Sequence, residues 1–137
     1  MPISLQWERH GAVKVLTGDV TGDELFNALA DLQNDPRFDA LRYVVEDFSG
    51  VGSVQLDAAG MDMLVDGAIG AALSNPHIRI AVVTGTPLLR TLARQFAAQS
   101  PYITQTFASL AAARAWIAEG DVEPVPLEWV LQTTIHA

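Results

Sequence analysis

Residues 41–64, with the sequence LRYVVEDFSGVGSVQLDAAGMDML, decide the fold of this chain. An apolar run rich in β-branched and aromatic residues ends in a carboxylate at Asp47, a pattern typical of a buried strand. Serine and glycine residues follow and indicate a loop. Asp57 then stands where it can cap a helix. The stretch therefore predicts a strand over 41–48, a loop, and a helix that ends before Pro76.

Toward the N-terminus, the sequence predicts a β-hairpin and a first helix. Apolar residues alternate with polar ones on both sides of Arg9-His10-Gly11, where Gly11 can supply the positive φ of a tight turn. Thr21 and Glu24 have the spacing of a capping box, and leucines at helical spacing follow. We therefore expect the first helix over 22–33.

Toward the C-terminus, two further strand and helix pairs follow. Residues 78–83 and 102–107 have the apolar, β-branched composition of strands. Pro87 and Ser109 stand at favourable starting positions for the two helices, and Gly120 is expected to close the last one.

Strands that alternate with helices predict an α/β domain with a mixed, mostly parallel sheet, an N-terminal antiparallel hairpin and about four helices. We expect this domain to cover residues 1–120. In the extension, residues 121–137, apolar residues alternate as in an edge strand or a dimer contact.

Composition narrows the possible functions. The 137 residues include no cysteine, which excludes disulfides, thiolate metal sites and thiol catalysis. Sixteen acidic and eight basic residues give a net charge of −8, which disfavours binding to nucleic acid. Neither a leader pattern nor a run of about 18 apolar residues occurs, so we expect a cytoplasmic protein without a transmembrane segment.

The order of these elements resembles the STAS fold of bacterial anti-sigma-factor antagonists, and in particular the SpoIIAA-like family related to SEC14-type domains. The resemblance covers residues 3–119. It is carried by the Gly18-Asp19-Val20-Thr21 turn with Glu24-Leu25, by Tyr43-Val44-Val45 ending in Asp47-Phe48-Ser49, by Asn75-Pro76 before Ile80-Ala81-Val82-Val83, and by Phe107-Ala108-Ser109 followed by Ala113 and Trp116.

In phosphoregulated members of that family, a segment like Asp-Ser-Ser-Gly-Leu begins the helix after the central strand, and one of its serines accepts phosphate. The matching segment here is Asp57-Ala58-Ala59-Gly60-Met61, which has no hydroxyl group. The resemblance thus implies a member without the usual phosphoswitch. Ser49 and Ser53 lie nearby and could replace it, although serines beside glycines commonly serve as loop formers.

The resemblance and the acidic composition together favour a non-enzymatic regulatory module that binds a basic protein partner. The expected binding surface is the 48–60 loop and the face of the second helix, with Ser49, Ser53, Asp57, Asp62 and Asp66. Asp62 and Asp66 could instead belong to a solvated helix face, and Asp57 could simply bond loop N–H groups. The dispersed histidines and the spacing of the acids predict neither a catalytic site, nor a metal site, nor a cofactor.

The sequence is compatible with two other sites. Thr84, Gly85, Thr86 and Arg90 combine a strand end, a glycine and a helix N-terminus, which can hold an anion or form an ordinary strand–helix junction. SEC14-type relatives enclose lipids, so the alternative function is a carrier of a small apolar ligand or lipid. Its pocket residues would be Met61, Leu64, Val65, Leu89 and Phe96, which would equally suit a filled core. Exposed sheet edges also suggest a homodimer.

Overall fold

The structure, a computed structural model, describes residues 2–119. Its five strands form one sheet in the order β1-β2-β3-β4-β5, in which β1 is antiparallel to β2 and all other neighbours are parallel. The strands are β1 (Ile3–Trp7), β2 (Gly11–Thr21), β3 (Tyr43–Gln55), β4 (Arg79–Val83) and β5 (Ile103–Phe107). The helices are α1 (Gly22–Asn34), the 3₁₀ helix η1 (Pro36–Ala40), α2 (Ala58–Ser74), α3 (Pro87–Gln99) and α4 (Leu110–Ile117).

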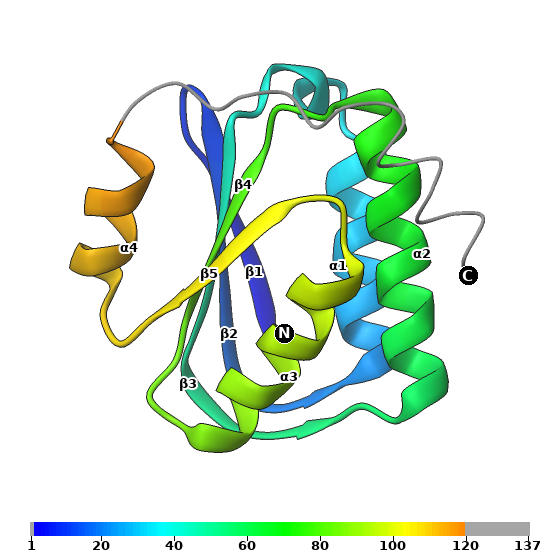
Figure 1. The fold of residues 1–137 in the computed structure, drawn as a ribbon, viewed down its shortest axis with the longest axis vertical. Coiled ribbons are helices and arrows are strands. Elements are labelled where there is room, and N and C mark those ends of the chain that lie inside the picture. The colour runs from blue at the N-terminus through cyan, green and yellow to red at the C-terminus, as the bar shows by residue number, and fades with distance from the viewer. Residues whose placement is uncertain (1, 120–137) are drawn as a thin grey trace.

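The helices form two unequal layers on the sheet. Helices α1, α2 and α3 cover one face, and α4 lies on the other (Figure 1). Each parallel crossover leads to the next strand in the same direction across the sheet, so the three connecting helices share one face. The expected α/β class with its mixed sheet, N-terminal hairpin and four helices is confirmed.

The helix starts follow the expected capping chemistry. The Glu24 backbone N–H donates to Thr21 Oγ1 over 3.2 Å, and the Thr21 backbone N–H donates to Glu24 Oε1 over 3.0 Å. Asp57 Oδ1 accepts from the Gly60 N–H at the start of α2 over 2.7 Å. These bonds satisfy N–H groups that the first turn of a helix leaves without partners.

The prediction of a loop over 48–60 is wrong for most of its length. Strand β3 continues to Gln55, because Gly50 to Gln55 pair with Thr17 to Thr21 of β2. The expected turn at Gly18 to Thr21 is for the same reason a strand, with irregular register at Gly18. A neighbouring strand supplies hydrogen bonds that outweigh the weak strand preference of serine and glycine.

The positive φ expected at Gly11 occurs instead at Gly18, where φ is 69°. Gly11 meets a different requirement: a Cβ atom there would overlap the ring of Tyr43 on the neighbouring strand. The hairpin prediction is therefore confirmed, but the role given to Gly11 is corrected.

Two hydrophobic clusters lie on the two faces of the sheet. The larger one packs beneath α1–α3, and the smaller one, around Val45, Ala81 and Ala113, packs beneath α4. None of the described helices is long and apolar enough to cross a membrane. The expected helix end at Gly120 and the extension 121–137 lie outside the described residues.

Candidate functional site

A surface groove of about 580 Å³ lies where α1 and α2 begin. Phe26, Leu56 and Met63 provide its apolar part, and Asp23 and Asp57 provide its charges. The Met63 side chain is 47% exposed. We refer to these five residues as the acidic groove. It combines an accessible apolar surface with negative charge, which suits the binding of a protein segment.

The exposed face of α2 extends this negative surface. Asp62 and Asp66 are exposed, one helical turn apart. The chain has no lysine or arginine from residue 15 to 36 or from residue 43 to 75, although each range contains five acidic residues. Helix α3 carries only arginines as charged residues, namely Arg90 and Arg94. Charge is therefore segregated, with a negative α1–α2 layer.

Ser49 and Ser53 lie on the exposed final part of β3, and both bond to carboxylates. Ser49 Oγ donates to Asp47 Oδ1 over 2.6 Å, and Ser53 Oγ donates to Asp19 Oδ1 over 2.7 Å. A phosphate on either serine would place two more negative charges beside an existing one. Asp47 Oδ1 also accepts from the Ser49 N–H over 3.0 Å.

At the junction between β4 and α3, threonine hydroxyls accept hydrogen bonds from backbone N–H groups. Thr84 is buried and its Oγ1 accepts from the Thr86 N–H over 3.2 Å, while Thr86 Oγ1 accepts from the Leu89 N–H over 3.4 Å. These bonds occupy two of the N–H groups that an anion would use. An anion site at Thr84, Gly85, Thr86 and Arg90 stays a prediction.

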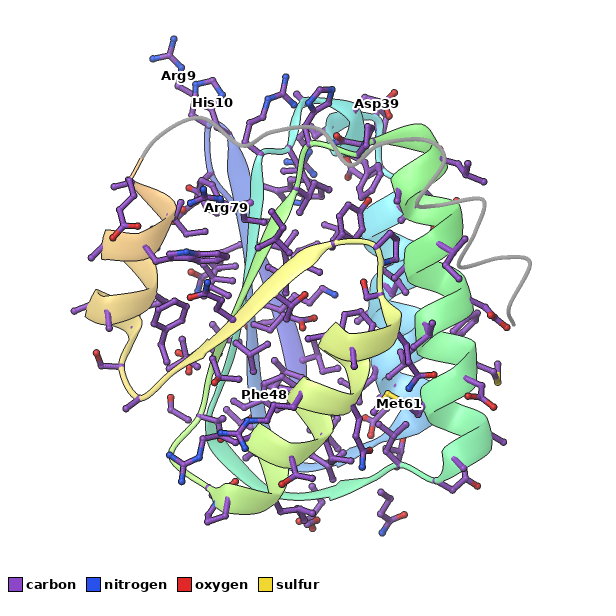
Figure 2. The ribbon with its side chains drawn as sticks, in the orientation of Figure 1. Arg9, His10, Asp39, Phe48, Met61 and Arg79 are labelled. Atoms are coloured by element: carbon purple, nitrogen blue, oxygen red, sulfur yellow. The ribbon has the colours of Figure 1, made fainter. Side chains whose placement is uncertain are left out.

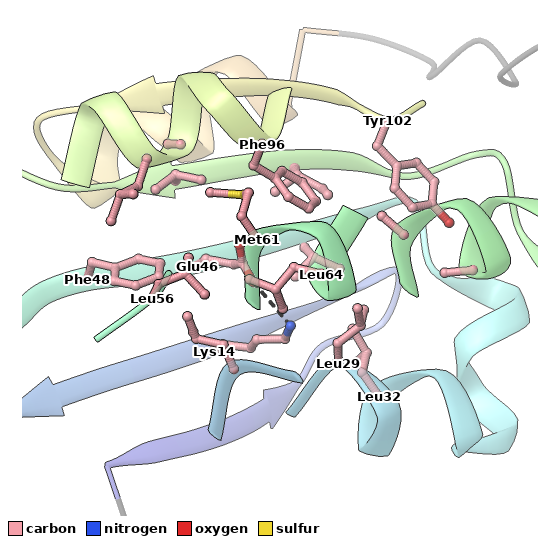
Figure 3. Close-up of a pocket in the computed structure, with 18 of the residues that line it drawn as sticks. Lys14, Leu29, Leu32, Glu46, Phe48, Leu56, Met61, Leu64, Phe96 and Tyr102 are labelled. Atoms are coloured by element: carbon pink, nitrogen blue, oxygen red, sulfur yellow. Dashed lines mark hydrogen bonds and ion pairs between the residues drawn. The ribbon is translucent and has the colours of Figure 1, made fainter. Parts of the chain in front are cut away.

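A cavity of about 110 Å³ lies between the sheet and helices α1–α3 (Figure 3). Met61, Leu64, Leu89 and Phe96 line it, as expected from the sequence, but Val65 is not among its lining residues. Figure 2 shows Phe48 and Met61 on the side of the sheet that α1–α3 cover. The structure thus brings four of the five predicted pocket residues together, and ligand binding there stays a prediction.

Lys14 and Glu46 form an ion pair in the wall of this cavity, with Nζ and Oε1 3.1 Å apart. They are partners on β2 and β3, and both side chains lie on the face covered by α1–α3. The side chain of Lys14 is 6% exposed and that of Glu46 is 22% exposed. Sequence reasoning missed this pair, although strand alternation places Lys14 on the same face as buried Ala12.

A second ionic cluster fastens α4 to the hairpin. Arg114 donates two hydrogen bonds to Glu8, of 3.0 and 2.8 Å, and the Tyr43 hydroxyl also donates to Glu8. The bonds from Arg114, and then that from Tyr43, lower the pKa of Glu8 below its usual range. Burial, together with Glu8, raises the pKa of Tyr43.

Beside this cluster, Arg79 stacks its guanidinium 4.9 Å from the ring centre of Trp116, on the α4 side of the sheet (Figure 2). Trp116 also packs with Phe107 on this side of the sheet, opposite the cavity. The described residues contain no group of three or more side chains suited to hold a metal ion.

Comparisons with known proteins connect this architecture to solved structures. The anti-sigma factor antagonist SpoIIAA in its unphosphorylated form superposes with a TM-score of 0.59 at 16% identity, covering 86% of this chain and 99% of that one. The fold is SpoIIAA-like. An anti-sigma factor antagonist from Mycobacterium paratuberculosis gives a TM-score of 0.56 at 12% identity, covering 85% of this chain and 93% of that one.

An uncharacterised DUF3478 protein with a SpoIIAA-like fold, from Shewanella loihica PV-4, gives a TM-score of 0.58 at 13% identity and covers 85% of this chain and 92% of that one. No family model matches the sequence, and a search of curated proteins finds no match. The likeness therefore establishes the SpoIIAA-like fold.

Proposed function

We propose that this protein is a non-enzymatic, cytoplasmic regulatory module that binds a basic protein partner. The binding surface is the acidic groove together with Asp62 and Asp66 on α2. The observation that carries the proposal is the segregation of charge, because a layer with acidic residues and no lysine or arginine attracts a partner of opposite sign. An apolar side chain of the partner would enter between Phe26, Leu56 and Met63.

The proposed module acts without phosphorylation at the start of α2. Ala58 and Ala59 occupy the first turn, where a phosphate would otherwise meet favourable helix N–H groups. Ser49 and Ser53 are each bonded to a carboxylate, which disfavours a phosphate at either position. Regulation would then depend on the availability of the partner.

The test is affinity capture from the native cell extract with three immobilised proteins: the wild type, Asp62→Arg/Asp66→Arg, and Asp39→Arg/Glu119→Arg. The last pair is a charge-matched control, because Asp39 and Glu119 are exposed and lie on η1 and just beyond α4. We expect the wild type and the control to retain a protein of basic isoelectric point that is released by about 0.5 M salt. Equal capture by all three proteins would reject the proposed surface.

The cavity supports a second candidate function, the binding of a small apolar ligand. Its volume of about 110 Å³ is below the roughly 300–1,000 Å³ of common ligand pockets, so a lipid would require the helices to move apart. Native mass spectrometry of freshly purified protein tests the carrier: a bound mass lost on denaturation supports it. An apo mass before and after addition of lipids and small apolar compounds contradicts it.

A further inference from the structure

The only lysine of the chain is buried in the wall of the cavity. Lys14 is 5% exposed, and its ammonium group is paired with Glu46 beneath α1 and α2 (Figure 3). Apart from this pair, the cavity wall is almost entirely aliphatic and aromatic. Replacing a buried ion pair with well-packed apolar residues is often neutral or stabilising, so stability does not by itself explain this pair.

The pair also has hydrogen-bonding capacity left over. An ammonium group has three N–H donors, and within residues 2–119 only the bond to Glu46 uses one of them. Glu46 Oε2 accepts no hydrogen bond from the described residues. The Glu46 side chain is 22% exposed, so the pair offers free N–H donors and a carboxylate oxygen to any small polar molecule, water included, that reaches the cavity.

Lys14 can also be approached from outside the cavity. It lines a second opening, of about 200 Å³, which is bordered by Ile3 and Leu5 of β1 and by Glu24 and Ala28 of α1. Lys14 therefore lies where the cavity and this opening meet. A small molecule that enters between β1 and α1 would meet Lys14 in the wall of this opening.

We propose that the cavity binds a small neutral alcohol, with the hydroxyl at Lys14 and Glu46 and the carbon chain among the apolar side chains. The inference rests on the second candidate function. Charge decides the class of ligand. Lys14 and Glu46 neutralise each other, so a carboxylate would leave two negative charges around one ammonium, and an amine would leave two positive charges around one carboxylate. A hydroxyl accepts from Lys14 and donates to Glu46 without adding charge.

Size narrows the class further. A cavity of about 150 Å³ accommodates benzene, so 110 Å³ suits a molecule of about five heavy atoms. 1-Butanol has this size and carries one hydroxyl. Butyrate and butylammonium have the same carbon chain with opposite charges, and pentane replaces the hydroxyl of butanol with a methyl group. These four compounds separate charge, hydrogen bonding and apolar contact.

Methionine methyl NMR of the full chain measures binding with an internal control. Met61 lines the cavity and is 6% exposed, whereas Met63 is 47% exposed and lies in the acidic groove. We expect 1-butanol to shift the Met61 signal saturably while the Met63 signal stays unchanged, and to bind at least tenfold more tightly than butyrate, butylammonium or pentane. Butyrate binding as tightly as butanol would overturn the assignment.

The variant Lys14→Met/Glu46→Leu tests the role of the pair while keeping the cavity apolar. It should lose the preference for butanol over pentane. If butanol and pentane bind the wild type equally, the alcohol assignment is overturned but ligand binding in the cavity survives. If no compound shifts Met61 in the wild type, both the inference and the second candidate function fail. The comparison of compounds on the wild type decides the matter even if the variant does not fold.

Discussion

At the scale of single residues, the Lys14–Glu46 pair joins two strands through charges that face a hydrophobic layer. Each charge is tolerable there because the other is 3.1 Å away. Removing one partner alone should therefore lower the stability more than removing both.

We predict that Lys14→Met alone lowers the free energy of unfolding by about 2–3 kcal/mol. This is less than the roughly 3–5 kcal/mol for breaking a fully buried pair, because 22% of the Glu46 side chain is exposed to water. Lys14→Met/Glu46→Leu should recover most of the loss. Urea unfolding measures both variants, and a double variant that is less stable than the single one would contradict this account.

The Glu8 cluster predicts a pH dependence. Arg114 and Tyr43 lower the folded-state pKa of Glu8, so its ionised form stabilises the native state. This contribution is present above the unfolded-state pKa of about 4.3 and disappears as the pH falls through the lower folded-state value. Arg114→Gln should therefore be less stable than the wild type at pH 7, and the difference should shrink below about pH 4.

Thermal unfolding between pH 7 and pH 3 measures this effect. Arg94→Gln is the matched control, because Arg94 is exposed on α3 and makes no ion pair within the described residues. Its effect should be small and independent of pH. A constant difference between Arg114→Gln and the wild type across this range would exclude Glu8 as the titrating group.

At the scale of elements, α1 and α2 approach each other closely at a glycine. A Cβ atom at Gly67 would lie 2.6 Å from Leu29 Cδ2, whereas one at Gly70 would have Gln33 Nε2, 3.9 Å away, as its nearest neighbour. Close packing applies at Gly67, and Gly70 has room for a methyl group.

Two alanine substitutions in α2 should therefore differ. Gly70→Ala should stabilise the protein by about 0.5–1 kcal/mol through helix propensity. Gly67→Ala gains the same propensity but must displace Leu29, so we expect it to be at least about 1 kcal/mol less stable than Gly70→Ala. Urea unfolding of the two variants measures the difference directly. Equal stabilities would mean that Leu29 moves aside freely.

At the scale of the whole molecule, the sheet is unequally protected. The first half of β3, Tyr43–Asp47, pairs with β2 on one side and β4 on the other, whereas residues 50–55 pair, among residues 2–119, with β2 alone. Val44 is buried beneath α1–α3 on one face of the sheet, and Val45 is buried beneath α4 on the other. Backbone opening should therefore be rarest in the first half of β3.

Amide hydrogen exchange should show this gradient. We expect the slowest exchange at Val44, Val45 and Ala81, and intermediate protection from residue 50 to 55. The edge strand β5 should exchange faster than the first half of β3, because within the described residues it pairs only with β4. Exchange at unprotected rates from residue 50 to 55 would restore the loop expected from the sequence.

The sequence by itself determined the order of the elements and the caps at Thr21 and Asp57. These features depend on neighbours within a few residues, so periodicity and capping patterns reveal them. The SpoIIAA-like architecture followed from that order. The acidic composition also indicated a negative surface, but not its concentration over α1 and α2.

Only the tertiary structure decided the features formed by residues distant in the sequence. The extension of β3 depends on β2, the Lys14–Glu46 pair joins residues 32 positions apart, and Arg114 reaches Glu8 across 106 positions. Likewise, Val65 was expected to line the cavity, but it is not among the lining residues. Local patterns cannot specify such contacts, because the free energy of a buried charge or an added strand depends on partners that only folding brings together.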